Sequence, residues 1–285
     1  MAWGFGYIGG VAAMLAFKPL YENGYLGDFE FGYKLVFPLT ALFFLVFSIP
    51  AFVFIKERAV VKNRESLLFL ARCGIRQVIG TIRNLKEHKN IAWFLLGFYF
   101  INDALVTIFA FVPIYARTTF GMEFKEIISL ILIVQIIGFP AATFFGMLSD
   151  KLGSKKILLF SIALWAIIVV LLAVATSKTM FYAVTLMTAL VIGSSQAVAR
   201  SWLSKLVPEE KRFEFFGFNG FASKVAATTG PVLFGSISVI TGNQRWAMIA
   251  LLPFFIVAFL IFYKIKDAHT KALLQTEKME IEDIN

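Results

Sequence analysis

GMLSDKLGSKK, residues 146–156, lies between two long apolar segments, 126–148 and 157–176. A connection this short predicts a tight turn, and its two glycines relax the backbone. Asp150 and three lysines keep the stretch in water. The stretch therefore predicts two apolar helices that run in opposite directions and meet at a charged turn.

Apolar residues dominate the rest of the chain as well. Of its 285 residues, 59% are apolar, only 16% are charged and 33 are Phe. Apolar runs of about 18 residues or more with few charges are typical of transmembrane helices, and this pattern excludes a soluble globular protein. We count eight runs, the first of them short: 2–17, 35–55, 91–115, 126–148, 157–176, 179–199, 214–240 and 246–263. We therefore expect an all-α membrane protein.

The net charge of +9 is distributed unevenly between the two sides of the predicted membrane. If each helix reverses direction, 20 of the 27 Lys and Arg fall in the loops at 56–90, 149–156, 200–212 and 264–285, and 6 fall on the opposite side. An excess of basic residues marks the cytoplasmic side. We expect a multi-pass protein of a bacterial-type cytoplasmic (inner) membrane with both termini cytoplasmic. Topology and anionic lipids then explain the basic charge, and no nucleic acid is needed.

The runs divide the chain into four parts. Residues 1–55 hold two helices, 56–90 form a basic connector, 91–265 hold six helices and 266–285 form a polar tail. Apolar residues in the connector recur at roughly helical spacing, which predicts an amphipathic helix at the inner membrane surface; a solvated linker is the alternative. The tail is expected to extend into the cytoplasm.

Signatures of enzymes and cofactor sites are missing from the sequence. Cys73 is the single cysteine, and His88 and His269 both lie outside the apolar runs. No His, Cys or carboxylate pair has metal-ligand spacing, and there is neither a phosphate-binding G-x-x-x-x-G-K-[ST] loop nor a G-x-S-x-G motif. We expect no metal, no cofactor and no enzymatic activity.

The turn at 146–156 resembles the loop pattern G-x-L-a-D-r-x-G-r-k of the major facilitator superfamily of transporters, with Lys for Arg at position 151 and Ser for Arg at position 154. Major facilitators usually have six helices, a connector and six more helices. The resemblance implies that this chain corresponds to the last eight of twelve helices. Residues 1–55 would be the last two helices of a truncated N-terminal bundle, and 91–265 a complete C-terminal bundle.

Further stretches are similar to the vacuole-effluxer-like branch of that superfamily. They are 6–10 (GYIGG), 102–108 (NDALVTI), 199–201 with 206–208 (ARS, LVP), 214–218 (EFFGF) and 230–231 (GP). Eukaryotic members of this branch are associated with amino-acid export from vacuoles, and many bacterial members have no assigned substrate. The resemblance implies alternating access, with the solute bound near the middle of the membrane.

Two charges stand out because charged groups inside a bilayer are costly and rare. Asp103 and Lys224 lie roughly 18 and 15 Å beyond the cytoplasmic starts of their helices, so we expect them to approach each other or to share a polar cavity. A functional pair and a purely structural ion pair both fit this placement. Asp103 is also a candidate proton carrier.

Further polar side chains extend these positions into a predicted path for a solute or ion. Tyr99, Asn102, Asp103 and Thr107 share one helix face. The remaining candidates lie on three other helices: Gln135, Gln196, and both Asn219 and Lys224 on the helix at 214–240.

The predicted gate combines residues of the turn at 146–156 with one residue at the cytoplasmic end of the helix at 179–199: Gly146, Asp150, Gly153, Lys155, Lys156 and Arg200. We expect Asp150 to pair with Arg200 or to face a positive helix N-terminus, that of residues 2–4. Such contacts would hold one state of the transport cycle. A static loop contact is the alternative.

The leading hypothesis is a secondary active transporter of a small polar solute, with amino-acid efflux as one form, in which protons are a possible coupling ion. The expected partners are the lipid bilayer, the solute, and either missing N-terminal helices or a second subunit. The alternative is a non-transporting membrane scaffold or accessory remnant.

Overall fold

The computed structural model describes residues 2–22, 29–54, 66 and 89–265. Within them every regular element is helical. The elements are α1 (Ala2–Glu22), α2 (Phe29–Phe54), α4 (Lys89–Phe120), α5 (Phe124–Leu152), α6 (Ser154–Val174), α7 (Lys178–Leu206), the short η1 (Glu209–Lys211), α8 (Arg212–Ala226), α9 (Thr229–Thr241), α10 (Gln244–Ile249) and α11 (Leu252–Lys264). The predicted amphipathic connector and the tail lie outside the described residues, apart from Ser66, Lys89 and Asn90.

The described helices are long and apolar enough for a multi-pass integral membrane protein. Seven spans qualify by length and composition, and Gly4–Leu20 is a shorter apolar helix. These eight segments coincide with the eight apolar runs of the sequence. The all-α membrane prediction is therefore confirmed.

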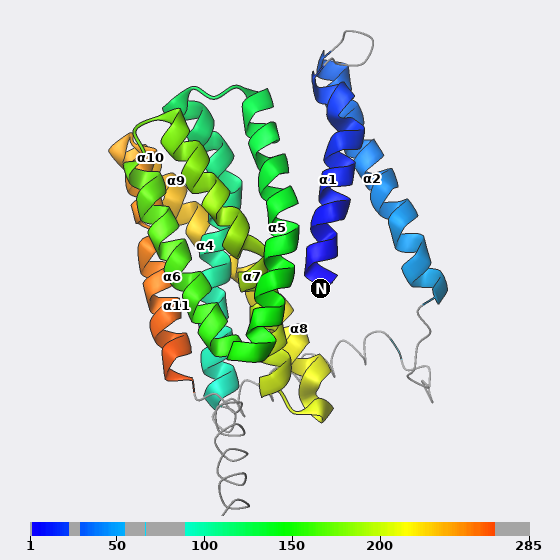
Figure 1. Ribbon diagram of the computed structural model, residues 1–285, viewed down its shortest axis with the longest axis vertical. Helices are drawn as coiled ribbons and strands as arrows, with labels where there is room; N and C mark the ends of the chain where they lie inside the picture. The colour runs from blue at the N-terminus through cyan, green and yellow to red at the C-terminus, as the bar shows by residue number, and fades with distance from the viewer. Residues whose placement is uncertain (1, 23–28, 55–65, 67–88, 266–285) are drawn as a thin grey trace, which may run out of the picture.

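Helices α4 to α11 form one bundle, and α1 and α2 lie beside it (Figure 1). Helix α1 packs along α5, whereas α2 contacts α1 on the side away from the bundle. Gly10 permits the close approach of α1, because a Cβ there would collide with Oε1 of Gln135 on α5. The first helix pair therefore reaches the bundle through α1.

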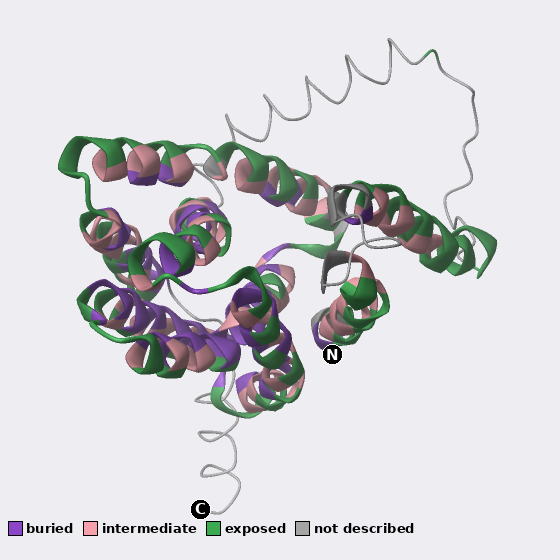
Figure 2. Ribbon diagram, turned by 90° about the horizontal axis from the view of Figure 1, so that it is seen from above, coloured by how far each residue is buried: buried purple, intermediate pink, exposed green. Residues whose placement is uncertain are grey.

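Aromatic rings connect several helices in the core of the bundle, whose other buried residues are mainly aliphatic. The Phe94 ring lies 5.5 Å from the Trp202 ring and 5.3 Å from the Phe262 ring, which joins α4, α7 and α11. Figure 2 shows buried residues on the inward faces of the bundle helices and exposed residues on their outer faces. On α2, Phe37 and Phe52 are about four-fifths exposed. An apolar outer surface of this kind suits lipid.

Two apolar runs that we predicted as single helices are each divided. The run 214–240 breaks between α8 and α9, and the run 246–263 breaks between α10 and α11. A proline ring collides with the carbonyl four residues earlier and cannot donate a hydrogen bond. Four residues before Pro231 is Ala227, directly after α8, and four before Pro253 is Ile249, the last residue of α10. Each break therefore coincides with the carbonyl that its proline would meet.

The charged stretch at 146–156 is more helical than predicted. Helix α5 continues to Leu152 and α6 begins at Ser154, so Gly153 alone connects them. Its φ of 94° lies in a region that glycine adopts and other residues avoid. The predicted reversal is present, but it is made by one residue instead of an eleven-residue turn.

Candidate functional site

Asp103 lies in the middle of α4 and is completely buried. The backbone N–H of Gly230 donates to both of its carboxylate oxygens, at 2.8 and 2.9 Å. On the same helix face, the hydroxyl of Thr107 donates to the backbone carbonyl of Asp103 at 2.7 Å. The intramembrane carboxylate therefore has a backbone partner.

The position of Gly230 explains that partner. It is the second residue of α9, and the first N–H groups of any helix have no acceptor within the helix. The side chain of Thr228, the residue before α9, makes no capping hydrogen bond. Asp103 supplies the missing acceptor from another helix, and a carboxylate is favourable at the positive end of a helix dipole.

The structure does not show an ion pair between Asp103 and Lys224, the closest form of the approach that the sequence predicts. The Lys224 side chain is exposed on α8, whereas Asp103 is buried against α9. No ion pair links the two among the residues that the structure describes. The break before Gly230 gives Asp103 a backbone N–H, so the carboxylate needs no cation.

Two more residues of the predicted path fasten α4 to the divided helix. The amide of Asn102 donates to the carbonyl of Ser223 at 3.1 Å, near the end of α8. The hydroxyls of Tyr99 and Thr229 are 2.8 Å apart, at the start of α9. The polar side chains on this face of α4 therefore contact residues on both sides of the break between α8 and α9.

A second feature is a cavity of about 290 Å³ inside the bundle. Helices α4, α5, α6 and α7 form its walls, and α1 contributes Tyr7. Its lining residues are Tyr7, Ile108, Phe109, Val112, Pro113, Ala116, Ile127, Leu130, Ile131, Val134, Gln135, Trp165, Leu172, Phe181, Thr185, Thr188 and Ile192. None of these side chains is charged.

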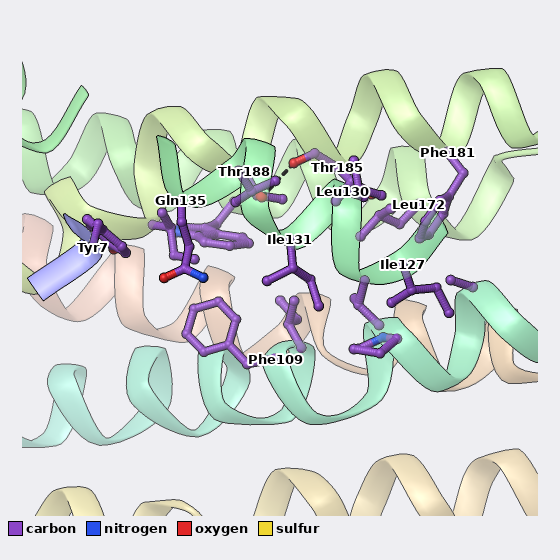
Figure 3. Close-up of a pocket in the computed structure, with 17 residues that line it drawn as sticks. Tyr7, Phe109, Ile127, Leu130, Ile131, Gln135, Leu172, Phe181, Thr185 and Thr188 are labelled. Carbon is purple, nitrogen blue, oxygen red and sulfur yellow. Dashed lines mark hydrogen bonds between the residues drawn. The ribbon is translucent and has the colours of Figure 1, made fainter. Parts of the chain in front are cut away.

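The helix pair and the bundle meet at one end of the cavity. Tyr7 and Gln135 lie at that end, and Leu172 and Phe181 lie at the other (Figure 3). Tyr7 packs on α5 and α7 where Gly138 and Gly193 leave room, and a Cβ on Gly193 would lie 2.9 Å from the Tyr7 ring. The amide nitrogen of Gln135 is 3.0 Å from the sulfur of Met14 on α1. The predicted candidate Gln135 therefore lines the cavity, at its contact with α1.

Two threonines that the sequence did not single out also line the cavity. Thr185 and Thr188 lie one turn apart on α7, and the hydroxyl of Thr188 donates to the carbonyl of Thr185 at 2.6 Å (Figure 3). A threonine in a helix commonly bonds to its own backbone in this way, so the residue type alone carries little signal. Their shared face with spacing i, i+3 is the only pattern that could have indicated them.

The remaining predicted residues lie elsewhere. Gln196 on α7 and Asn219 on α8 are both buried, but neither lines the cavity. The side-chain oxygen of Asn219 has no hydrogen-bond partner among the described residues. Their place in a solute path stays a prediction.

The predicted gate lies at the end of the bundle where α5 meets α6. Asp150 pairs with Lys205 on α7 at 3.4 Å, a partner that the sequence did not indicate. Lys205 also donates to Ser154 at 3.3 Å, and Ser149 donates to Ser154 at 3.1 Å. Lys205 lies five residues after Arg200, within the last turn of α7. These contacts join α5, α6 and α7.

The other gate residues divide into structural and exposed ones. Lys155 donates to the carbonyls of Tyr263 and Ile265 at 2.8 and 2.7 Å, at the C-terminal end of α11. A cation is favourable there because the last carbonyls of a helix lack partners. Lys156 and Arg200 are exposed. A small cavity of about 140 Å³ between α5 and α7 is lined by Gly146 and Asp150, among others.

Metal binding finds no support in the described ranges, where no group of three or more His, Cys, Asp or Glu side chains could hold an ion.

Comparison with known proteins identifies the family. The sequence profile of the family described as "Vacuole effluxer Atg22 like" matches residues 1–272. The chain belongs to this family. Among relatives of this Atg22-like chain, the uncharacterized MFS-type transporter YxiO of Bacillus subtilis is 25% identical over 228 residues, covering 80% of the chain and 52% of that protein. The Kluyveromyces lactis Autophagy-related protein 22 is 26% identical over 194 residues, covering 64% of the chain and 39% of that protein.

A third relative extends the range of similar proteins. The Tetracycline resistance protein, class H, of Pasteurella multocida is 31% identical over 136 residues, which are 48% of the chain and 33% of that protein. The Atg22-like chain thus spans about half the length, or less, of these curated relatives. The resemblance to the major facilitator superfamily and to its vacuole-effluxer branch is confirmed. The match to the last eight of twelve helices stays a prediction.

Proposed function

We propose that the chain is part of a secondary active transporter that works by alternating access. The observation that supports this most strongly is the cavity at the contact between α1 and helices α4 to α7. Because Tyr7 comes from the helix pair and the other walls come from the bundle, movement of one unit against the other would open and close the cavity. Rocking of two such units is the usual mechanism of these folds.

The transported solute is proposed to be small. The family is described as vacuole effluxer-like, and one relative is named for tetracycline resistance. The predicted substrate, a small polar solute such as an amino acid, is one candidate within this proposal. The basic loops support a cytoplasmic (inner) membrane with both termini inside.

The outer face of the helix pair is proposed to contact further helices, either those of a longer chain or those of a second copy. The span Lys34–Phe54 of α2 is not buried at all. A transporter built on two units needs a second unit about as large as the bundle, and one pair of helices does not provide it.

The gate and the proton path also belong to this proposal. The contacts of Asp150 and Lys205 link three helices at one end of the bundle, where a gate would have to act. Asp103 is a buried carboxylate that a proton could neutralise, and Gly230 lies at a helix break, where backbone movement is easier than in a continuous helix. An imposed pH gradient, applied to Asp103→Asn and to Lys224→Gln, separates a coupling role from a packing role.

Counterflow in proteoliposomes tests transport. Vesicles containing the purified 285-residue chain are loaded with one unlabelled solute at a time, amino acids first, and uptake of the labelled solute is followed. We expect saturable counterflow for at least one small organic solute, absent from protein-free vesicles. The contrary result is a chain that is well folded in the vesicles but exchanges none of the solutes. If co-expression with the N-terminal helices of a longer relative does not restore exchange, a scaffold role is favoured.

A further inference from the structure

One lysine lies without a partner in the middle of an apolar span. Lys224 belongs to α8, in the span Glu214–Thr241, roughly 15 Å beyond the start of that span. Its side chain is exposed, and its ammonium group makes no hydrogen bond or ion pair within the described residues. The side chain is too short to reach the membrane surface from this depth, and charges inside a membrane almost always have a partner. Lys224 therefore needs an acceptor.

Helix α8 has two opposite faces. On the inner face, Phe215 and Asn219 are buried, and the carbonyl of Ser223 accepts a hydrogen bond from Asn102 of α4 at 3.1 Å. On the other side, residues with the spacing i, i+3, i+4 and i+7 share one face. All four are exposed: Gly217, Gly220, Phe221 and Lys224. Lys224 thus lies on a face of α8 that is turned away from α4.

This face is open to a much greater extent than the other bundle helices. In the apolar stretch of the span Glu214–Thr241 only 12% of residues are buried, whereas the other spans of the bundle have 33% to 61%. A Cβ added at Gly217 or at Gly220 would meet nothing within 4 Å. The packing of this chain therefore requires glycine at neither position. Small residues on an open helix face permit the close approach of another membrane helix.

A second copy of this chain does not supply the acceptor. Among the described residues, Asp103 is the only carboxylate away from the ends of the long helices, and it is buried and bonded to Gly230. Lipid tails carry no acceptor either. The match to YxiO covers 52% of that protein, so about half of this relative lies outside the part that the chain resembles.

We propose that the exposed face of α8 docks a transmembrane helix that this chain does not contain, and that this helix carries a carboxylate at the depth of Lys224. The two charges form an ion pair inside the membrane, and the two glycines let the helices approach closely. The inference goes beyond the proposed function, because it concerns the bundle and not the outer face of α2, and it does not depend on transport.

Synthetic transmembrane peptides test the proposal. Each peptide consists of about 24 Leu and Ala residues, carries a donor dye, and has Asp, Asn or Lys at its centre. The whole chain, with an acceptor dye on its single cysteine Cys73, is reconstituted in phosphatidylcholine vesicles, and energy transfer is followed as peptide is added. We expect the Asp peptide to bind at least about tenfold more tightly than the Asn peptide, as a charge-assisted hydrogen bond implies.

Charge variants identify the residue that recognises the peptide. Lys224→Met should remove the preference for the Asp peptide over the Asn peptide. Lys224→Asp should reverse the preference, so that the Lys peptide binds more tightly than the Asn peptide. Lys156→Met, which removes an exposed lysine at the end of another helix, should leave the preference unchanged.

Two phenylalanine variants locate the face. Gly220→Phe adds bulk to the open face of α8, and its Cβ meets nothing in the fold. Ile167→Phe alters α6 at a residue that is 53% exposed. We expect the first to weaken binding of the Asp peptide by at least about tenfold and the second to leave it within about twofold.

The contrary results are equally specific. Equal affinity for the Asp and Asn peptides, or an unchanged preference in Lys224→Met, would overturn the proposal. Displacement of the Asp peptide by the soluble anion benzoate would assign Lys224 to an anionic solute and would overturn it as well. Counterflow without a preference for the Asp peptide counts only against this inference, and the preference without counterflow counts only against the proposed function.

Discussion

Gly230→Ala is the most informative single change at the contact between α4 and α9. A Cβ built on Gly230 collides with the hydroxyl of Thr107 and lies 2.8 Å from a carboxylate oxygen of Asp103 and 3.0 Å from its carbonyl oxygen. All three atoms belong to buried residues of one helix. Alanine therefore fits only if α9 moves away from α4.

The expected loss follows from two effects. Adding a methyl group to a close-packed site costs about 1–3 kcal/mol. Moving Gly230 away also weakens its hydrogen bond to the Asp103 carboxylate, and bonds to charged groups contribute roughly 1.5–3 kcal/mol. Together these effects predict a loss of about 2–5 kcal/mol in the free energy of unfolding.

Gly235 provides the matched control, because it lies on the same helix and a Cβ there meets nothing within 4 Å. Gly235→Ala should leave stability unchanged or raise it by about 0.5–1 kcal/mol, since alanine is favoured over glycine inside a helix. Unfolding of both variants is measured in mixed micelles with increasing denaturing detergent. If Gly230→Ala were as stable as Gly235→Ala, the described contact between Asp103 and α9 would be wrong.

The other predictions concern the ends of the helices. Lys155→Met removes two donors from the end of α11 and should lower the free energy of unfolding by about 1–2 kcal/mol, whereas Lys156→Met, at an exposed position, should change it by less than about 0.5 kcal/mol; detergent unfolding of both variants checks this. Asp150→Ala breaks an exposed pair with Lys205 and should lower the free energy of unfolding by less than about 1 kcal/mol. A large change in transport rate while stability stays nearly the same would reveal a gating role. Thiol labelling of Cys73 in intact cells and in inside-out vesicles tests orientation: a membrane-impermeant reagent should label it only from the cytoplasmic side, and labelling of intact cells would reverse the proposed topology.

The membrane fold could be predicted from the sequence because apolar run length is a strong signal. Each of the eight runs became a helix or a pair of helices. The breaks at Pro231 and Pro253 were missed because neither proline interrupts the apolar pattern. Prolines inside α4 and α5 leave those helices continuous, so proline alone does not decide where a helix in a membrane divides.

The candidate site was only partly accessible to sequence reasoning. The polar face of α4 could be predicted from helical spacing, and Tyr99, Asn102 and Asp103 all contact α8 or α9. The partner of Asp103 could not, because it is a backbone N–H that becomes available only when the helix breaks, and backbone groups leave no mark on composition. Thr185 escaped notice for a related reason: the residue type is ordinary, and only its place in the lining of the cavity sets it apart.

The most direct test of transport through the cavity is counterflow by two tryptophan variants of α5, one at Ile131 in the cavity wall and one at Ile133, which is exposed on the outside. Both are reconstituted at equal density, and the initial rate of labelled solute entry is compared with that of the unaltered chain. Ile131→Trp should reduce the rate by more than tenfold, and Ile133→Trp should leave it within about twofold, because only the first side chain occupies the cavity. Equal rates in the two variants would show that solute does not pass through this cavity.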